Sequence, residues 1–231
     1  VMPALLKGDE VIFDFDGVLA DTEPLHLRMF QKCLAAKKIS LSREEYLEKY
    51  LGLDDRACFQ AVYRDKGESL SSKVEEELVR SKNRMLLDAI AENSPLLPGV
   101  REVIRLLKGK YYLAIVSGAL ESEIRAVLRQ GDLESAFHLI VSAESVDHGK
   151  PEPDGFLEAI KLLNRDHVPE SEILLPDECL VVEDSPWGLE AARRAGIPAI
   201  AVTSSYPAER LAGAVQVLSH IKDLPKFLTG D

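Results

Sequence analysis

The chain has 231 residues, of which 46% are hydrophobic and 29% are charged, as is ordinary for a soluble globular protein with one large domain or a core and a smaller insert. Its net charge of -11 argues against nucleic acid or an anionic membrane as the main partner, because both need a basic surface. A small anionic ligand remains compatible with this charge, because it needs only a local cluster of donors and a metal ion.

Six short apolar runs, bounded by turn residues, predict the strands of the fold. They cover residues 11–15, 111–118, 138–144, 179–184, 198–204 and, more weakly, 215–220. Continuous runs of this kind are typical of strands that are buried on both faces of a parallel sheet. The amphipathic segments that alternate with them predict helices over 99–110, 119–131, 153–164 and 185–197. The alternation predicts an α/β fold class with a Rossmann-like, doubly wound, mostly parallel sheet.

One long segment interrupts this alternation. Residues 24–95 contain amphipathic helical sequence and no convincing strand. A segment of roughly seventy residues is too long for a simple crossover between the first two strands. We therefore expect an inserted helical subdomain over 24–95 and an α/β core domain formed by 1–23 and 96–231.

Three further features concern the compartment. The cysteines Cys33, Cys58 and Cys179 are far apart and show no disulfide framework or CxxC metal pattern. The first ten residues lack a basic segment followed by a long apolar core, so we expect no signal peptide. No apolar stretch approaches the roughly 20 residues needed to span a bilayer. These features favour the reducing cytoplasm, and we expect a monomer.

Polar residues gather where the predicted strands end. They are Asp14, Asp16, Ser117, Gly118, Lys150, Glu183 and Asp184. Ligands of an open α/β sheet bind beyond the carboxyl ends of its strands, so we expect these side chains to meet at one edge. Burying neighbouring carboxylates without a partner costs several kcal/mol, so a cation is expected beside Asp14 and Asp16.

This set of side chains points to phosphoryl transfer. Several carboxylates describe a hard-cation site, and Mg²⁺ is the usual occupant where few protein ligands and waters suffice. Lys150 supplies a further positive charge. Ser117 and the amides of Gly118 and Ala119, at the start of a predicted helix, can hold phosphate oxygens. A carboxylate, a divalent cation, a lysine and an amide cradle together form a phosphoryl-transfer site.

The positions of the two acids suggest their roles. Asp14 would attack phosphorus and form an aspartyl-phosphate, while the cation and Lys150 offset its repulsion from the phosphate. Asp16 is two residues farther along an extended chain and so points the same way. It would protonate the leaving oxygen and then deprotonate the attacking water.

Four stretches of the chain resemble the four motifs of the haloacid-dehalogenase-like superfamily, in order and with the usual spacing. They are "DFDGVLADTE", "VSGA", "GKPEPD" and "VVEDSPWGLEAARRAG". The first, third and fourth are most similar to the β-phosphoglucomutase-like branch, and residues 24–95 fall where that branch carries a helical cap. The resemblance extends from Val11 to about Thr203.

The resemblance implies roles for the motif residues. Asp14 is the nucleophile and Asp16 the general acid/base, while Ser117 and Lys150 bind the phosphoryl group. Asp14, the Asp16 carbonyl and Asp184 hold Mg²⁺, with Glu183 beside them. Dehalogenases and phosphonate-cleaving members lack the second acid, so Asp16 favours an oxygen leaving group. Thr22, in the first motif, is a further candidate for substrate binding.

The predicted cap offers four more substrate-binding candidates. His26 lies ten residues after Asp16, where mutase-like members have a histidine, although a helix-face histidine with no role is an equal alternative. Arg56 follows a glycine turn much as a sugar-phosphate-binding arginine does in related caps, but it falls one residue late. Lys82 and Asn83 resemble a pair that faces the distal phosphate there. Basic residues of charged amphipathic helices are also expected simply to be solvated.

The sequence therefore favours a Mg²⁺-dependent phosphatase that hydrolyses a small sugar- or polyol-phosphate monoester through an aspartyl-phosphate. A β-phosphoglucomutase-type mutase is the main alternative, because it uses the same residues at the chemical centre. A phosphorylatable receiver-type signalling module is a more distant alternative. Receivers place the phosphorylated Asp at the end of a later strand, and neither "VSGA" nor "LIVSAE" supplies one.

Overall fold

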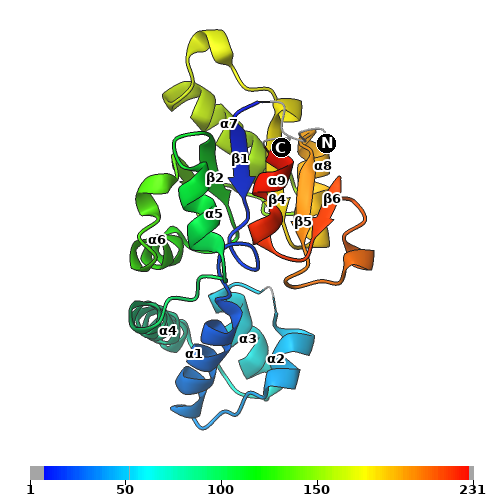
Figure 1. Cartoon of the computed structure of the whole chain (residues 1–231). Helices are drawn as coiled ribbons and strands as arrows, with labels where there is room; N and C mark the ends of the chain where they lie inside the picture. Colours follow the sequence, from blue (N-terminus) through cyan, green and yellow to red (C-terminus); the bar gives the residue numbers. More distant parts are fainter. Residues whose placement is uncertain (1–7, 52, 229–231) are drawn as a thin grey trace. The chain divides into compact units, whose positions relative to one another are not determined.

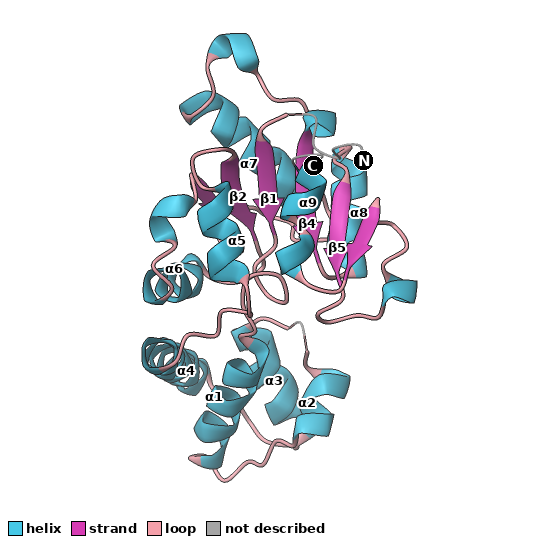
Figure 2. Cartoon of the chain, in the orientation of Figure 1, coloured by secondary structure: helices cyan, strands magenta, loops and turns pink. Residues whose placement is uncertain are grey.

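The strands predicted from the apolar runs form one six-stranded, fully parallel sheet (Figures 1 and 2). The structure, a computed structural model, describes residues 8–51 and 53–228. The strands are β1 (Glu10–Phe13), β2 (Tyr112–Val116), β3 (Leu139–Val141), β4 (Cys179–Glu183), β5 (Ala199–Val202) and β6 (Gln216–Leu218). Every residue of β1, β4 and β5 is buried, which explains why these runs are apolar without alternation.

The strand order is β3-β2-β1-β4-β5-β6, so the direction of winding reverses between β1 and β4. The helices of this part are α5 (Val100–Leu107), α6 (Glu121–Gln130), α7 (Asp154–Asp166), α8 (Pro186–Ala195) and α9 (Pro225–Leu228). Helices α5 and α9 lie on one face of the sheet and α7 and α8 on the other (Figure 2). The predicted doubly wound α/β fold is confirmed, and its reversal between β1 and β4 marks the expected ligand-binding edge.

Within residues 8–51 and 53–228 five short 3₁₀ helices, which the sequence did not predict, lie in the connections. They cover Glu134–Ala136, Glu170–Glu172, Pro176–Glu178, Ala208–Arg210 and Ile221–Asp223.

Two helix starts bear on the site. Ser185 caps α8 by accepting a hydrogen bond from the Gly188 N–H at 3.0 Å, and Pro186 occupies the first helical position, as the sequence indicated. Helix α6 begins at Glu121, two residues later than the predicted start. Ala119 therefore lies in a loop, and its N–H donates a hydrogen bond to the Ser117 hydroxyl oxygen at 3.0 Å.

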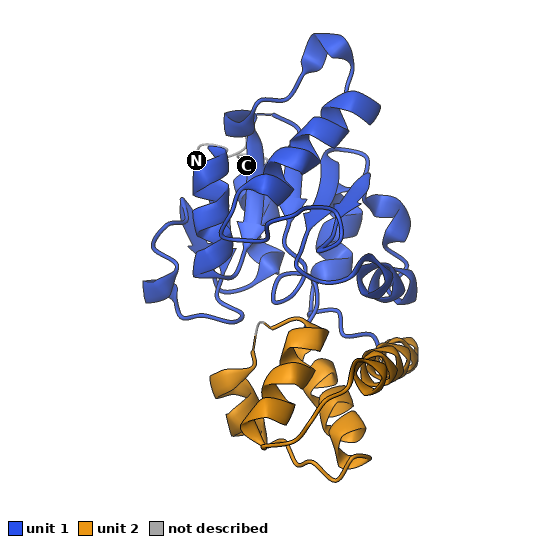
Figure 3. Ribbon diagram, turned by 180° about the vertical axis from the view of Figure 1, so that it is seen from behind, with its two compact units in different colours: residues 1–21, 94–231 blue, residues 22–93 orange. Residues whose placement is uncertain are grey.

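The chain divides into two compact units (Figure 3). Unit 1 comprises residues 1–21 and 94–231, and unit 2 comprises residues 22–93. The expected domain boundaries, after residue 23 and after residue 95, each fall two residues beyond these divisions. Residues 1–7, which belong to the segment inspected for a signal peptide, lie outside the described residues.

The regular elements of unit 2 that the structure describes are all helices, as expected for the insert. Its helices are α1 (Glu23–Ala35), α2 (Arg43–Lys49), α3 (Asp55–Asp65) and α4 (Ser72–Glu92). Ser42, Asp54 and Ser71 cap α2, α3 and α4 by accepting a backbone N–H in the first turn. The unit has its own apolar core, in which the rings of Phe30 and Phe59 pack edge to face at 5.0 Å. Within the described ranges 8–51 and 53–228, no helix has the length and apolarity that crossing a membrane requires.

Candidate active site

Asp14 lies directly beyond β1, at the point where the strand order reverses. Its N–H donates to the Val182 carbonyl of β4 at 2.9 Å, which continues the β1–β4 ladder by one residue and fixes the backbone. The side chain is almost fully buried, with 8% of the residue exposed. A carboxylate in this position requires a cationic partner.

Lys150 supplies that partner from the loop after β3. Its ammonium nitrogen lies 2.6 Å from Asp14 Oδ1, 2.6 Å from Glu183 Oε1 and 3.0 Å from the Val116 carbonyl oxygen. All three ammonium hydrogens are therefore directed at acceptors. Burial lowers the pKa of Lys150, but Asp14 and Glu183 outweigh this and raise it above its usual value. Lys150 stays charged and holds the Asp14 carboxylate in place.

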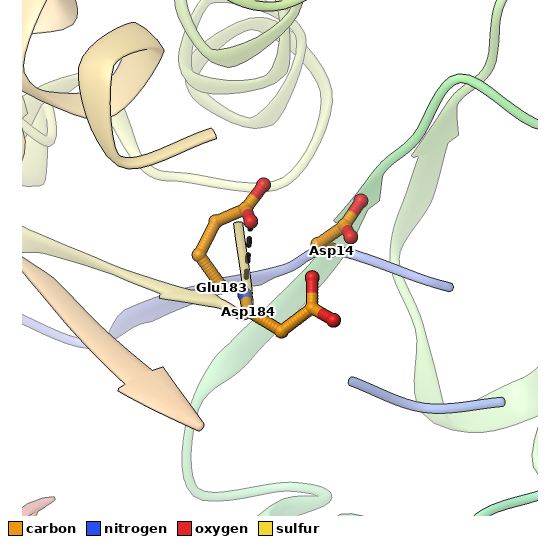
Figure 4. Close-up of side chains that lie close together, drawn as sticks. All are labelled: Asp14, Glu183 and Asp184. Atoms are coloured by element: carbon orange, nitrogen blue, oxygen red, sulfur yellow. Dashed lines mark hydrogen bonds between the residues drawn. The ribbon is translucent and has the colours of Figure 1, made fainter. Parts of the chain in front are cut away.

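Glu183, the last residue of β4, is fully buried and connects Lys150 to the start of α8. Its Oε2 accepts from the Asp184 N–H at 2.9 Å, the Ser185 N–H at 3.0 Å and the Ser185 hydroxyl at 2.9 Å. The bond to the Asp184 N–H is drawn in Figure 4. A Cβ on Gly188 would lie only 1.7 Å from Glu183 Oε1, so the first turn of α8 needs glycine there. Both Glu183 oxygens are occupied, which makes this residue a support for Lys150.

Asp184 completes a cluster of three acids with Asp14 and Glu183 (Figure 4). Each acid offers an oxygen within 4.8 Å of the others, and all three residues are buried. Asp184 Oδ2 is buried and has no hydrogen-bond partner among the described residues. The turn after β1 approaches it closely, because a Cβ on Gly17, whose φ is +78°, would lie 1.8 Å from this oxygen.

The cluster fits a hard divalent cation. Its donors are carboxylate oxygens, and a buried anionic oxygen without a partner is stabilised by a metal ion. Burial raises the pKa of Asp14, with Lys150 opposing, and burial raises that of Asp184 to about 6, with the Ser205 hydroxyl opposing. These increases reflect three acids that share one lysine, and a bound cation would reverse them.

The remaining residues predicted in unit 1 lie at or beside this cluster. Asp16 is partly exposed in the turn after β1, where the Gly17 N–H bonds the Ala20 carbonyl at 2.7 Å. Its carboxylate is not one of the three clustered acids. Ser117 is buried at the end of β2, and its N–H donates to the Val141 carbonyl at 3.0 Å. Gly118 is exposed and has open space around its α-carbon.

The substrate-binding candidates predicted in unit 2 separate into two groups. His26, Lys82 and Asn83 lie in the helical bundle, where Lys82 is fully buried and its ammonium contacts His26 Nδ1 at 2.8 Å. Arg56 instead points to the surface of α3, with 57% of its side chain exposed and a 2.7 Å ion pair to Glu75. Thr22, at the start of α1, is buried. Gly52, the glycine of the predicted turn, lies outside the described residues.

Three residues that the sequence did not single out contribute to these arrangements. Ser185 donates its hydroxyl to the Glu183 carboxylate, whereas the sequence places it only at the start of the helix predicted over 185–197. Gly188 provides the space for that carboxylate. Asp55 bonds the buried Lys82 at 2.6 Å. The Ser-Pro-x-Gly spacing after "VVED" was a usable signal for the first two, whereas nothing local marks Asp55 as a partner of Lys82.

A family profile described as haloacid dehalogenase-like hydrolase matches residues 11–202, which include all of the acids, the lysine and the serine of the site. The chain belongs to the haloacid dehalogenase-like hydrolase family. It is therefore an enzyme, and the alternative of a receiver-type signalling module is wrong. The resemblance to this family inferred from the four motifs is confirmed.

Two curated relatives in this family are similar over most of their length. The chain is 32% identical over 222 residues to the phosphorylated carbohydrates phosphatase of Thermotoga maritima, covering 94% of this chain and 89% of that protein. It is 31% identical over 195 residues to hexitol phosphatase B of Escherichia coli K12, and this match covers 83% of this chain and 82% of that protein.

A solved structure of a family member shares the architecture. CbbY from Rhodobacter sphaeroides, as a variant in complex with xylulose-(1,5)bisphosphate, superposes with a TM-score of 0.79 and 26% identity. The match covers 95% of this chain and 96% of that one. The family and its α/β fold with a helical insert are therefore supported by sequence and by structure.

Proposed function

We propose that this hydrolase is a Mg²⁺-dependent phosphatase that cleaves a small sugar- or polyol-phosphate monoester through an aspartyl-phosphate on Asp14. The observation that carries the proposal is the buried Asp14 carboxylate, fixed 2.6 Å from Lys150 beside an Asp184 oxygen that has no partner among the residues the structure describes. The substrate class follows relatives that are named for phosphorylated carbohydrates and hexitols.

The first half-reaction moves the phosphoryl group to the enzyme. A carboxylate oxygen of Asp14 forms a bond to phosphorus while the bond from phosphorus to the ester oxygen breaks. Asp16 donates its proton to the departing oxygen, which leaves as the alcohol. Lys150 opposes the effect of burial on the pKa of Asp14 and orients its carboxylate during the approach of the anionic ester.

The second half-reaction returns the enzyme to its starting state. Asp16, now ionised, takes a proton from a water molecule as the water oxygen bonds to phosphorus. The bond between phosphorus and the Asp14 oxygen breaks, and inorganic phosphate leaves. Asp16 thus alternates between acid and base, which suits a partly exposed carboxyl outside the three-acid cluster.

Asp14, Asp184 and the main-chain oxygen of Asp16 would hold Mg²⁺, since the Glu183 oxygens already carry their hydrogen bonds. When bound, the ion would supply positive charge to the phosphoryl oxygens.

Ser117 would contact the phosphoryl oxygens directly. Its hydroxyl oxygen accepts from the Ala119 N–H at 3.0 Å, which leaves the hydroxyl hydrogen free to donate. The exposed amide of Gly118 would bind a second phosphoryl oxygen. Cytoplasmic location and a monomeric state remain predictions from the sequence.

The test is phosphate release from a panel of sugar and polyol phosphates with Mg²⁺, followed by acid quench and mass spectrometry of the peptide containing Asp14. We expect a mass increase of one phosphoryl group on Asp14 and loss of turnover in Asp14→Asn. Asp132→Asn is the matched control, because Asp132 is an exposed acid with φ of 57°, which asparagine also adopts.

Two results would overturn the proposal. Turnover that survives Asp14→Asn would show that another group is the nucleophile. Efficient conversion of β-glucose 1-phosphate to glucose 6-phosphate without net phosphate release would show a mutase instead of a phosphatase.

A further inference from the structure

The loop that leads from β2 to α6 carries the two groups proposed to hold the phosphoryl oxygens, Ser117 and Gly118. This phosphoryl-binding loop covers residues 117–120, between the end of β2 and the first residue of α6. At its start the Ser117 N–H donates to the Val141 carbonyl oxygen at 3.0 Å. Loops are more mobile than the elements that they connect, so accurate phosphoryl contacts require that the far end of this loop is also held in place.

The far end of the loop meets α6, which has no cap from its own segment. Leu120, at the N-cap position, makes no side-chain hydrogen bond to the first turn. The first N–H groups of a helix have no partner within the helix and need one from elsewhere. Here the Glu121 N–H donates to Oε2 of Glu144 at 3.1 Å. Glu144 lies 23 residues farther along the chain than Glu121, in the loop after β3, so a second loop caps α6.

A further hydrogen bond joins the same two loops. The Ala143 N–H donates to the Ala119 carbonyl oxygen at 3.1 Å. Ala119 is thereby held on both sides, because its own N–H donates to the Ser117 hydroxyl oxygen at 3.0 Å. Gly118 stands between these two residues in the chain. The bonds made by Ala143 and Glu144 therefore fasten the far end of the phosphoryl-binding loop to the loop after β3.

The backbone that presents Glu144 is itself held by a tight turn. Ser142 is buried, and its hydroxyl oxygen accepts from the Glu144 N–H at 3.3 Å. The Ser142 N–H donates to Ser145 Oγ at 3.0 Å, and the Ser145 N–H donates to the Ser142 carbonyl oxygen at 3.0 Å. An ordered turn of this kind lowers the entropy that Glu144 loses when its side chain forms a hydrogen bond. The same loop continues to Lys150, so the phosphoryl-binding loop is tied to the segment that carries the ammonium group.

We propose that Glu144 is a positioning residue, which fixes Ser117 and Gly118 in the geometry that binds the phosphoryl group. This inference rests on the proposed phosphatase function, because it concerns the same site. Glu144 acts through the Glu121 N–H and the loop before it, by a hydrogen bond and not by its charge. The phosphoryl group is common to all phosphate monoesters, so the effect is the same whichever alcohol leaves.

Two other roles for Glu144 make different predictions. A simple helix cap would stabilise α6 and would leave phosphate binding unchanged. A competitor for phosphate would use its negative charge to occupy the start of the helix, where anions are stabilised, so its removal would strengthen phosphate binding. Neither role accounts for the adjacent bond from Ala143 to Ala119, which holds the residue directly after Gly118.

The experiment compares Glu144→Ala and Glu144→Gln with the matched control Glu178→Ala. Glu178 is also a glutamate whose Oε2 accepts one backbone N–H, that of Leu175, at 3.0 Å. It directly precedes β4, so it lies at the amino ends of the strands, away from the site. For each protein the measurements are the Tm, calorimetric titration with inorganic phosphate in the presence of Mg²⁺, and kcat and KM for a hexitol monophosphate and for phenyl phosphate.

Glu144→Ala should weaken phosphate binding and lower kcat/KM for both esters by the same factor, roughly tenfold, because the phosphoryl contacts are no longer held in register. Glu144→Gln should retain the parent values, since its amide oxygen still accepts from the Glu121 N–H. Glu178→Ala should lower the Tm as Glu144→Ala does, but leave phosphate affinity and turnover unchanged. Should Glu144→Ala fail to fold, Glu144→Asp takes its place, because its shorter side chain withdraws the carboxylate and should also weaken phosphate binding.

Four results would overturn the inference. Phosphate affinity that is unchanged in Glu144→Ala would show a simple cap, and tighter binding would show a competitor. An equal loss in Glu144→Gln would show that the charge matters and not the hydrogen bond. A loss of kcat/KM for one ester alone would indicate a contact with the alcohol. If the parent releases phosphate from neither ester, the proposed function is contradicted, and the phosphate titration still tests the role of Glu144.

Discussion

The contribution of Glu10 to the stability of the protein should fall as the pH rises from 5 to 8, because this glutamate is buried at the amino end of the central strand. Glu10 opens β1 with none of its surface exposed. The Cys179 thiol donates to its Oε2 at 3.0 Å, and its Oε1 has no partner among the described residues. Burial raises the pKa of Glu10 from 4.5 to about 7, while the bond from Cys179 opposes this only in part.

The sign and size of the effect follow from that pKa. A carboxyl group whose pKa is raised in the folded state does not reduce the free energy of unfolding at pH values well below 4.5. The reduction grows as the pH rises through about 7. An increase of about 2.5 pKa units corresponds to about 3.4 kcal/mol once Glu10 is fully ionised. At pH 5.5 the cost is about 1.4 kcal/mol, so roughly 2 kcal/mol is lost between pH 5.5 and 8.5.

The substitution Glu10→Gln isolates this contribution, because it keeps the shape and removes the ionisation. We expect Glu10→Gln to be more stable than the parent, with a difference that widens by about 2 kcal/mol between pH 5.5 and 8.5. Urea unfolding of both proteins at four pH values gives this difference directly, since all other titrating groups cancel. Glu209→Gln, at an exposed position, is the control. A difference that stays constant with pH would refute the reasoning.

Three further predictions address the site and the insert. Gly188→Ala should displace the Glu183 carboxylate, lower stability by about 2 kcal/mol or more and reduce kcat over a hundredfold. Gly213→Ala is the control and should change neither stability nor kcat, because its added Cβ would lie 3.7 Å from the nearest atom. Asp184→Asn should raise the Tm in EDTA, because it removes a buried charge on an oxygen without a partner among the described residues. Added Mg²⁺ should then raise the Tm of this variant less than that of the parent. An equal increase in Tm for both proteins would place the ion elsewhere. The His26 ring should stay neutral in NMR spectra down to pH 5, because burial and Lys82 lower its pKa to about 3. Because the neutral ring is favoured in the folded state, the contribution of His26 to stability falls as the pH drops below about 6.5. Titration of the ring near pH 6.5 would contradict its contact with Lys82.

The fold could be predicted well because three of its strands, β1, β4 and β5, are buried on both faces. Buried strands require continuous apolar runs, and these are visible in the sequence without knowledge of any partner. The run at 111–118 nevertheless exceeds the strand Tyr112–Val116, because the hydrogen bonds to β3 end at the Ser117 N–H and Gly118 is exposed. The order of the strands depends on contacts between distant segments, so periodicity alone could not give it.

The residues of the candidate site fall into two classes by the range of their contacts. Asp14 and Asp184 are predicted from motifs because each stands at the end of its own strand. The partners in the helical insert are set by rotation about a helix axis, where one residue turns the side chain by about 100°. Asp55 therefore faces Lys82, while its neighbour Arg56 faces Glu75 and solvent. If a helix motif is aligned one position out of register, the residue assigned to the site is therefore one whose side chain points elsewhere.

The charges around Lys82 and Lys150 explain why a divalent cation is expected at one cluster and not at the other. In unit 2, Asp55 balances Lys82, and the neutral His26 adds no charge, so a phosphate gains nothing there. In unit 1, Lys150 faces three clustered acids, which leaves two negative charges uncompensated when all are ionised. A phosphate ester would add more negative charge to this buried group. A divalent cation removes the excess, and because the coupling is reciprocal, phosphate binding and Mg²⁺ binding must strengthen each other.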